Sequence, residues 1–301
     1  MKHKVLVIGA SGMLGIEVVK ELSKNINVNL YATIRSNADK SKINKYLNND
    51  ISNIKFYKFN IHGNYKKKLK EIVSNKDYII NCVGVIKPYI DEKDPESIKN
   101  ALDVNSLFPH ILNKSIKKNT KIFQIATDCV YNGEKGKYFE KDNHNANDIY
   151  GKSKSVGEVK SDNFFNIRCS IIGIEIKSFK SLLCWFLNQK INANIFGFKN
   201  HLWNGITTKH FGKIISVIIT KKIQIPNMLH IVPGNIVNKY ELLKLFQKKF
   251  KRNDLKITKV DAKLIVNRTL QSSYKKLNSK INRSLGYKKN PSIKQMIDEI
   301  I

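Results

Sequence analysis

Apolar and polar positions alternate regularly through the first half of the chain. Short runs rich in Val, Ile and aromatic residues, typical of strands buried on both faces, are separated by stretches with helical periodicity. The predicted strands span residues 4–8, 29–34, 54–61, 77–86, 121–131 and 164–173. Helices are predicted over 13–25, 67–75, 97–118 and 150–161. This order predicts an α/β fold, a Rossmann-type doubly wound parallel sheet with a cleft at the carboxyl ends of its strands.

Beyond Gly173 the alternation becomes less regular. Helices are predicted over residues 178–190, 210–222 and 238–250, and a strand over 227–234. We therefore expect a Rossmann domain over residues 1–172 and a smaller C-terminal lobe, mainly substrate-binding, over 173–301. Some segments of that lobe, around 226–240, are expected to return to the Rossmann sheet.

The stretch "VIGASGMLG", residues 7–15, links the first strand to the first helix. Its glycines follow the spacing G-x-x-G-x-x-G, which suits either a tight turn or a cradle for a phosphate. The flanking strand and helix favour the cradle, because free N–H groups and a partial positive charge stand at a helix N-terminus. Glycine also lets the backbone approach a pyrophosphate. The expected dinucleotide contacts here are Gly9, Ser11, Gly12, Met13, Leu14 and Gly15.

The end of the second strand indicates which dinucleotide binds. Sites for NAD usually carry an acid there, which holds the ribose 2′-OH. In this chain Thr33, Arg35 and Ser36 follow instead, and Arg35 suits the 2′-phosphate of NADP, unless it is only a solvated surface residue. We predict NADPH as the cofactor, with NADH as the alternative. Weaker candidates are Asn60 and Ile61 beside the adenine, and Cys82, Val83 and Gly84 beside the middle of the cofactor.

Tyr150 and Lys154 share one face of a predicted helix, because they are four residues apart. A phenol has an ordinary pKa of about 10, which a nearby ammonium and an oxidised nicotinamide would lower. The same spacing occurs at Tyr89/Lys93, Tyr131/Lys135 and Tyr240/Lys244. Only Tyr150 opens a helix directly after a strand that ends in another hydroxyl, that of Thr127. We predict that Tyr150 protonates a carbonyl oxygen to which Thr127 also donates a hydrogen bond.

Six motifs, in order, resemble those of the extended short-chain dehydrogenase/reductases. They are "GASGMLG", "NCVG", "VNSLFP", "IATDCVYNG", "YGKSK" and "NIRCSIIG". "TDCVYNG" followed by "YGKSK" is most similar to dTDP-4-dehydrorhamnose reductases and related nucleotide-sugar 4-ketoreductases. The resemblance covers roughly the first 175 residues well and continues more weakly beyond them.

This resemblance implies a catalytic trio of Thr127, Tyr150 and Lys154, with Lys154 also binding the nicotinamide ribose. Thr127 and Asp128 would contact the sugar, and Asn105 would lie on the helix behind the site. From the residues themselves, Trp203 is a candidate for the sugar pocket and Arg268 for the phosphates of the nucleotide-sugar. The expected function is NADPH-dependent reduction of a 4-keto-6-deoxy nucleotide-sugar in deoxysugar and cell-surface polysaccharide biosynthesis.

Two alternatives remain open at this stage. An epimerase could use the same fold, and a non-catalytic NADP-binding regulatory subunit could retain it. A dehydratase is disfavoured, because Cys129 stands where those enzymes carry Glu. Ile171 replaces an aromatic residue that the rhamnose enzymes tend to carry, so the identity of the sugar stays open.

The composition adds few constraints. The chain of 301 residues has a formal net charge of +30, but Lys is spread throughout and Arg is scarce, so we expect no nucleic-acid partner. Such a charge could steer an anionic nucleotide-sugar to its site. Four distant cysteines without C-x-x-C spacing predict reduced thiols and no metal site. Short apolar runs and no apparent signal peptide predict a cytoplasmic protein without membrane insertion, with a homodimer as an option.

Overall fold

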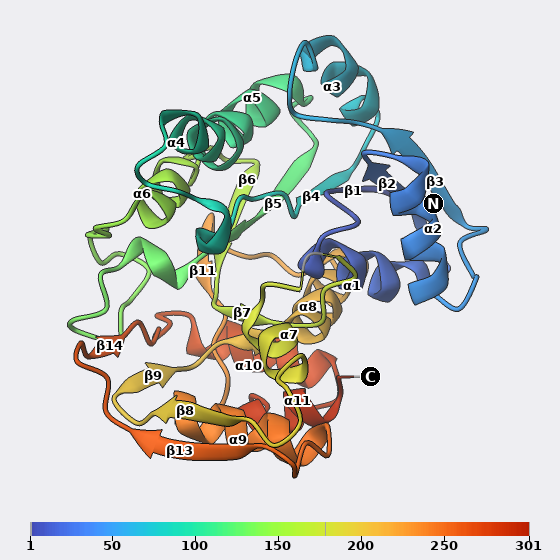
Figure 1. Cartoon of the computed structure of the whole chain (residues 1–301). Coiled ribbons are helices and arrows are strands. Elements are labelled where there is room, and N and C mark those ends of the chain that lie inside the picture. Colours follow the sequence, from blue (N-terminus) through green and yellow to red (C-terminus); the bar gives the residue numbers. More distant parts are fainter. Residues whose placement is uncertain (1, 178, 301) are drawn as a thin grey trace.

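The computed structural model describes residues 2–177 and 179–300, so Ser178, the first residue of one predicted helix, lies outside it. A sheet of seven parallel strands dominates the fold, in the order β11-β6-β5-β4-β1-β2-β3 (Figure 1). The strands are β1 (His3–Ile8), β2 (Val28–Ile34), β3 (Ile54–Lys58), β4 (Tyr78–Asn81), β5 (Lys121–Ala126), β6 (Phe164–Arg168) and β11 (Met228–His230). The predicted Rossmann-type α/β fold is confirmed. The strand order reverses between β1 and β4, where such sheets bind their ligands.

Helices cover both faces of this sheet. They are α1 (Met13–Ser23), α2 (Asn37–Tyr46), α3 (Lys66–Val73), α4 (Pro95–Leu102), α5 (Phe108–Ser115), α6 (Ile149–Val156) and α8 (Thr208–Thr220). Strand β1 serves two cores, because successive side chains point to opposite faces. Val5 and Val7 join the core that includes α1 and α8, whereas Leu6 and Ile8 join the core of α3 and α5. A sheet buried on both faces explains the nearly continuous apolar run of β1.

The predicted helix over 97–118 is interrupted in the structure. Helices α4 and α5 are joined by a π-helical turn over Asp103–Leu107. Such turns shift the backbone register and are frequent at functional sites. Here the turn carries Asn105, which is only 1% exposed.

The second half of the chain forms small sheets and helices, gathered below the large sheet in Figure 1. Strand β7 (Ile171–Ile172) pairs with β10 (Ile206–Thr207), β8 (Asn194–Phe198) with β13 (Lys256–Val260), and β9 (His201–Trp203) with β12 (Val237–Asn238) and β14 (Val266–Asn267). Helices α7 (Leu182–Leu187), α9 (Lys239–Lys249), α10 (Lys275–Ser284) and α11 (Ile293–Asp298) complete this part.

Two elements of the second half lie in the large α/β layer. Strand β11, within the segment 226–240, pairs with β6 at the edge of the seven-stranded sheet. Helix α8 packs along α1. Across residues 2–177 and 179–300, none of the helices combines the length and apolarity needed to cross a bilayer, and no cluster of side chains suits a metal ion.

Candidate active site

In the glycine turn after β1, the lack of side chains lets backbone atoms lie very close to one another. Gly9 has a φ of +84°, and a Cβ added to Gly15 would stand 2.1 Å from the Gly9 carbonyl oxygen. The Gly9 N–H donates a hydrogen bond to Thr33 Oγ1 at 2.9 Å, which ties the turn to the end of β2. Gly12 is the N-cap of α1 and has no side chain with which to cap it. Among the residues that the structure describes, no capping side chain accepts a hydrogen bond from the N–H groups at this helix start, which leaves them for an anionic ligand.

A cavity of about 260 Å³ lies at the carboxyl ends of β1 to β4, beside this turn. Nine of the predicted cofactor residues line it, namely Gly9, Ser11, Gly12, Arg35, Asn60, Ile61, Cys82, Val83 and Gly84. The other five predicted cofactor residues, Met13, Leu14, Gly15, Tyr150 and Lys154, are not among the lining residues, and Leu14 is 5% exposed in the core beneath the turn. Lys177, from the segment after β7, also lines the cavity, and no sequence pattern distinguishes it from the many other lysines.

Helix α6 brings Tyr150 to the turn after β5. Thr127 is the N-cap of a 3₁₀ turn over Asp128–Val130, and its side chain lies close to the Tyr150 phenol. Burial raises the pKa of Tyr150 above its ordinary value, with Cys129, Asp128 and Asp148 adding to the shift and the neighbouring Thr127 opposing it. The phenol is therefore protonated at neutral pH and can serve as a proton donor.

Lys154 lies one helical turn farther along α6 and is only 6% exposed. Its Nζ donates a hydrogen bond to the Ile125 carbonyl oxygen at 2.9 Å and lies 3.9 Å from the position of a Cβ on Gly84. Burial lowers the pKa of Lys154 to about 8, although the charge of Glu158 opposes this shift. A cationic group thus stands beside the cavity, close to the phenol-bearing face of α6.

Asn105 joins the loop after β4 to α6. Its Nδ2 donates to the Val85 carbonyl oxygen and to Ser153 Oγ, at 2.9 and 3.0 Å, and its Oδ1 accepts from the Val85 N–H at 2.9 Å. All of these contacts are with the protein itself. Asn105 therefore acts as a positioning residue that fixes the cavity wall against the helix bearing Tyr150 and Lys154.

In the turn after β5, Asp128 lies among charged groups. Burial raises the pKa of the Asp128 carboxyl, while the cations Arg268 and Lys239 oppose that shift. Arg268 Nε donates to the Tyr131 carbonyl oxygen at 2.8 Å, and Lys239 Nζ lies 5.9 Å from the centre of the Trp203 ring. Trp203 itself is 5% exposed and contributes more to the core than to an open pocket surface. Lys239, at the start of α9, could not be told from other lysines by sequence.

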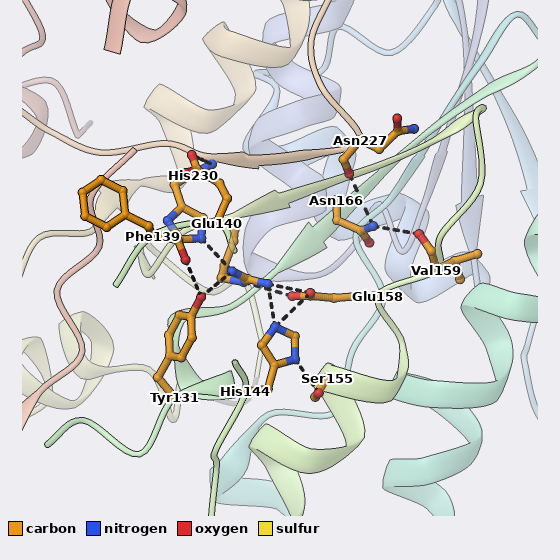
Figure 2. A network of polar contacts seen from close by, with 11 residues as sticks. Tyr131, Phe139, Glu140, His144, Ser155, Glu158, Val159, Asn166, Asn227 and His230 are labelled. Carbon is orange, nitrogen blue, oxygen red and sulfur yellow. Dashed lines mark hydrogen bonds and ion pairs between the residues drawn. The ribbon is translucent and has the colours of Figure 1, made fainter. Parts of the chain in front are cut away.

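A buried polar network contacts the C-terminal end of α6 at Ser155 (Figure 2). Arg168, at the end of β6, is 1% exposed and pairs with Glu158 through Nε and Nη2, at 3.0 and 2.6 Å. Its Nη1 donates to the Tyr131 hydroxyl at 2.7 Å and lies 2.6 Å from His230 Nε2. Nη2 also lies 2.8 Å from Nε2 of His144. The Nδ1 of this histidine is hydrogen-bonded to Ser155 Oγ on α6.

This network also explains two histidines for which spacing alone indicates no role. Burial lowers the pKa of His230 to about 4, with the Arg168 charge acting in the same direction. Burial likewise lowers the pKa of His144. Both rings are therefore neutral near pH 7, so each can accept a hydrogen bond from the guanidinium.

A family model described as "RmlD substrate binding domain" matches residues 3–301 of the chain. Among solved structures, a dTDP-4-dehydrorhamnose reductase from Bacillus anthracis in complex with NADP is 18% identical, with a TM-score of 0.71 over 100% of this chain and 99% of that one. A hypothetical dTDP-4-dehydrorhamnose reductase from Sulfolobus tokodaii is 23% identical, with a TM-score of 0.69 over 94% of each chain.

A UDP-glucuronic acid 4-epimerase from Bacillus cereus in complex with NAD is 17% identical, with a TM-score of 0.72 over 98% of this chain and 94% of that one. No curated protein matches the sequence. At these identities the solved structures support the fold, and both cofactors occur among them.

Proposed function

Because the chain belongs to the family of the RmlD substrate binding domain, we propose that it reduces a 4-keto-6-deoxy nucleotide-sugar with NADPH. The observation that carries this proposal is that Thr127 lies close to Tyr150, while the Lys154 ammonium lies 3.9 Å from the position of a Cβ on Gly84, a residue that lines the cavity. These residues supply a hydroxyl, a protonated phenol and a buried ammonium, the last two from residues one turn apart on α6. These groups suit the addition of a hydride and a proton to a carbonyl.

The residues lining the cavity fit a nicotinamide dinucleotide. The free N–H groups at the start of α1 suit the pyrophosphate, and Arg35 at the rim suits a 2′-phosphate. Asn60 and Ile61 line the cavity and would lie beside the adenine, and Lys154 would bind the nicotinamide ribose. When bound, the cofactor supplies the hydride that adds to the sugar carbon.

The protein's own part in the reaction is proton transfer and positioning. Negative charge grows on the carbonyl oxygen as the hydride adds, and Tyr150 donates its proton to that oxygen while Thr127 holds it by a hydrogen bond. The product is the alcohol. Asp128 contacts the sugar, and Arg268 is suited to the phosphates of the nucleotide, with Lys239 and Trp203 on the same side.

Cys129 favours a reductase over a dehydratase. Eliminating water from a sugar needs an acid and a base beside the carbons involved. Burial raises the pKa of the Cys129 thiol to about 12, with the Asp128 charge adding to the shift, so the thiol stays protonated and is no base at neutral pH. In this proposal the 6-deoxy group is already present in the substrate and is not created by this chain.

The decisive experiment is a substrate panel. Purified protein with NADPH is given dTDP-, UDP- and GDP-linked 4-keto-6-deoxysugars, with the parent hexose nucleotides as controls. We expect NADPH oxidation and a product two mass units heavier with at least one ketosugar, and none with the parent compounds. Interconversion of sugars without NADPH oxidation would identify an epimerase. Cofactor binding without turnover across the panel would identify a regulatory subunit.

A further inference from the structure

Lys177 connects two parts of the cofactor cavity that are distant in the sequence. It comes from the segment after β7, yet its Nζ lies 2.8 Å from Ser11 Oγ in the glycine turn. The same Nζ lies 2.8 Å from Oδ1 of Asp39, near the start of α2. One ammonium therefore links the glycine turn, where the pyrophosphate is expected, to the region after β2, where the 2′ group of the adenosine ribose is expected.

Asp39 is an acid that follows β2 after all. It stands five residues beyond the strand, but its Oδ2 turns back to accept a hydrogen bond from the Arg35 N–H at 3.1 Å. The residue is 7% exposed, and although burial opposes it, hydrogen bonds from Lys177 and the Arg35 N–H hold the pKa of the carboxyl below its ordinary value. A carboxylate at this strand end is the group that holds the ribose 2′-OH in NAD sites, and it repels a 2′-phosphate.

The cavity exposes the cations rather than this acid. Lys177 and Arg35 both line the cavity, whereas Asp39 lies behind Lys177 and is not among the lining residues. A 2′-phosphate approaching from the cavity would thus meet two positive groups. Since one of them already pairs with Asp39, the local charge of the three side chains is positive.

We propose that Lys177 sets the cofactor preference, by neutralising Asp39 and by offering, with Arg35, a second cation to the 2′-phosphate of NADPH. This inference rests on the proposed use of NADPH. Without Lys177, the Asp39 carboxylate loses its ion-pair partner, while its hydrogen bond from the Arg35 N–H remains. The site then carries an acid without a paired cation, as NAD sites do, in a cavity that is otherwise suited to NADPH by Arg35.

The test is the variant Lys177→Gln, with dissociation constants for NADPH and NADH measured by titration of dihydronicotinamide fluorescence, without any sugar. We expect NADPH affinity to fall about ten- to a hundredfold, while NADH affinity stays level or rises. Lys177→Arg should keep the preference for NADPH. In Lys177→Gln combined with Asp39→Asn, any gain in NADH affinity should disappear, because the exposed carboxylate is gone.

Lys40→Gln is the matched control. Lys40 lies on α2 one residue beyond Asp39, but its Nζ points over the Phe56 ring, 5.5 Å from the ring centre. This change removes the same charge from the neighbourhood and should leave the ratio of the two dissociation constants within about twofold.

Two results would overturn the inference while leaving the proposed function intact. An unchanged ratio in Lys177→Gln would mean that Arg35 alone selects NADPH. An equal loss of affinity for both cofactors would mean that Lys177 serves the pyrophosphate that they share. A wild-type chain that binds neither cofactor would instead refute the proposed function itself.

Discussion

Gly151 lies so close to Cys129 that a Cβ built on it would stand 2.2 Å from the Cys129 carbonyl oxygen. Helix α6 thus begins in direct backbone contact with the turn after β5. Any side chain at position 151 would push the helix outward and separate Tyr150 from Thr127. The geometry of the candidate site therefore depends on a residue that takes no part in its chemistry.

Tyr150→Phe should strongly reduce catalysis without preventing cofactor binding. The change keeps the ring and its packing but removes the proton that the reduction requires. We expect kcat to fall about 10²- to 10⁴-fold while NADPH affinity stays nearly unchanged. Steady-state kinetics with the reactive ketosugar and a cofactor titration measure the two effects.

Tyr240→Phe supplies the control for that change. Tyr240 has the same Tyr-x-x-x-Lys spacing but lies on α9, against Gly197 of β8. Its loss of a hydroxyl should leave kcat unaltered. Inactivity of Tyr240→Phe together with full activity of Tyr150→Phe would show that the active site has been assigned to the wrong helix.

Arg35→Ala should narrow the difference between NADPH and NADH. Arg35 lines the cavity and is exposed at the end of β2. A charge-assisted contact with a 2′-phosphate contributes about 1.5–3 kcal/mol, so we expect a ten- to hundredfold loss of NADPH affinity and little change for NADH. Equal dissociation constants for the two cofactors in the unaltered chain would refute this role.

Two neighbouring glycines should respond differently to Ala. A Cβ on Gly15 would overlap the Gly9 carbonyl, whereas a Cβ on Gly12 has nothing closer than 3.4 Å. Gly15→Ala should therefore destabilise the fold by about 1–3 kcal/mol or more. Gly12→Ala should fold normally but weaken NADPH binding about tenfold or more, because its methyl group enters the phosphate cradle. Thermal melting and cofactor titration separate the two effects, and normal NADPH affinity in Gly12→Ala would argue against the cradle.

The lowered pKa of Lys154, about 8, predicts how pH acts on the site. Its ammonium is charged below pH 8 and is lost above it, so NADPH affinity should weaken as pH rises from 7 to 9. In the unfolded chain a Lys has a pKa of about 10.4, so keeping this charge buried costs stability below pH 8. That cost is relieved between about pH 8 and 10.4. Lys154→Met should remove both dependences, and an unchanged pH profile of binding in this variant would assign the titration to another group.

The pair of Arg168 and Glu158 should be important for stability. Glu158→Gln leaves a buried guanidinium without its counter-charge, which costs about 3–5 kcal/mol in comparable cases. Lys199→Gln breaks an exposed pair with Asp261 and should cost about 0–1 kcal/mol. Urea denaturation midpoints of the two variants give the comparison. Equal small shifts would mean that the other partners of Arg168 are sufficient to compensate its charge.

The parallel sheet was predictable because its signals are local. The glycine turn, the run before it and the stripe of Leu14, Val18 and Leu22 after it lie within about twenty residues and specify β1 and α1 by periodicity alone. The π-helical turn at Asn105 was not predictable, because a one-residue shift in the helical register does not visibly change the spacing of the apolar residues. A single long helix was the natural prediction there.

Sequence patterns did not identify several residues of the candidate site, for a different reason. Lys177 and Lys239 belong to a chain with 54 Lys and Arg residues, so only their positions distinguish them. Asp39 stands four residues after Arg35, and its role depends on a side chain that folds back to the strand. Arg168 gathers partners from four separate segments. Such long-range relationships are set by the tertiary fold, not by local spacing.

The packing of α8 along α1 has a consequence for how the chain is made. The first 172 residues leave the ribosome before α8, yet α8 packs along α1 and its buried residues belong to the same apolar core. At about 5–20 residues per second the delay lasts a few seconds. During that interval the nascent chain carries an uncovered apolar surface, and strand β6 still lacks its neighbour β11. Completion of the seven-stranded sheet must therefore wait for residues translated long after its other strands.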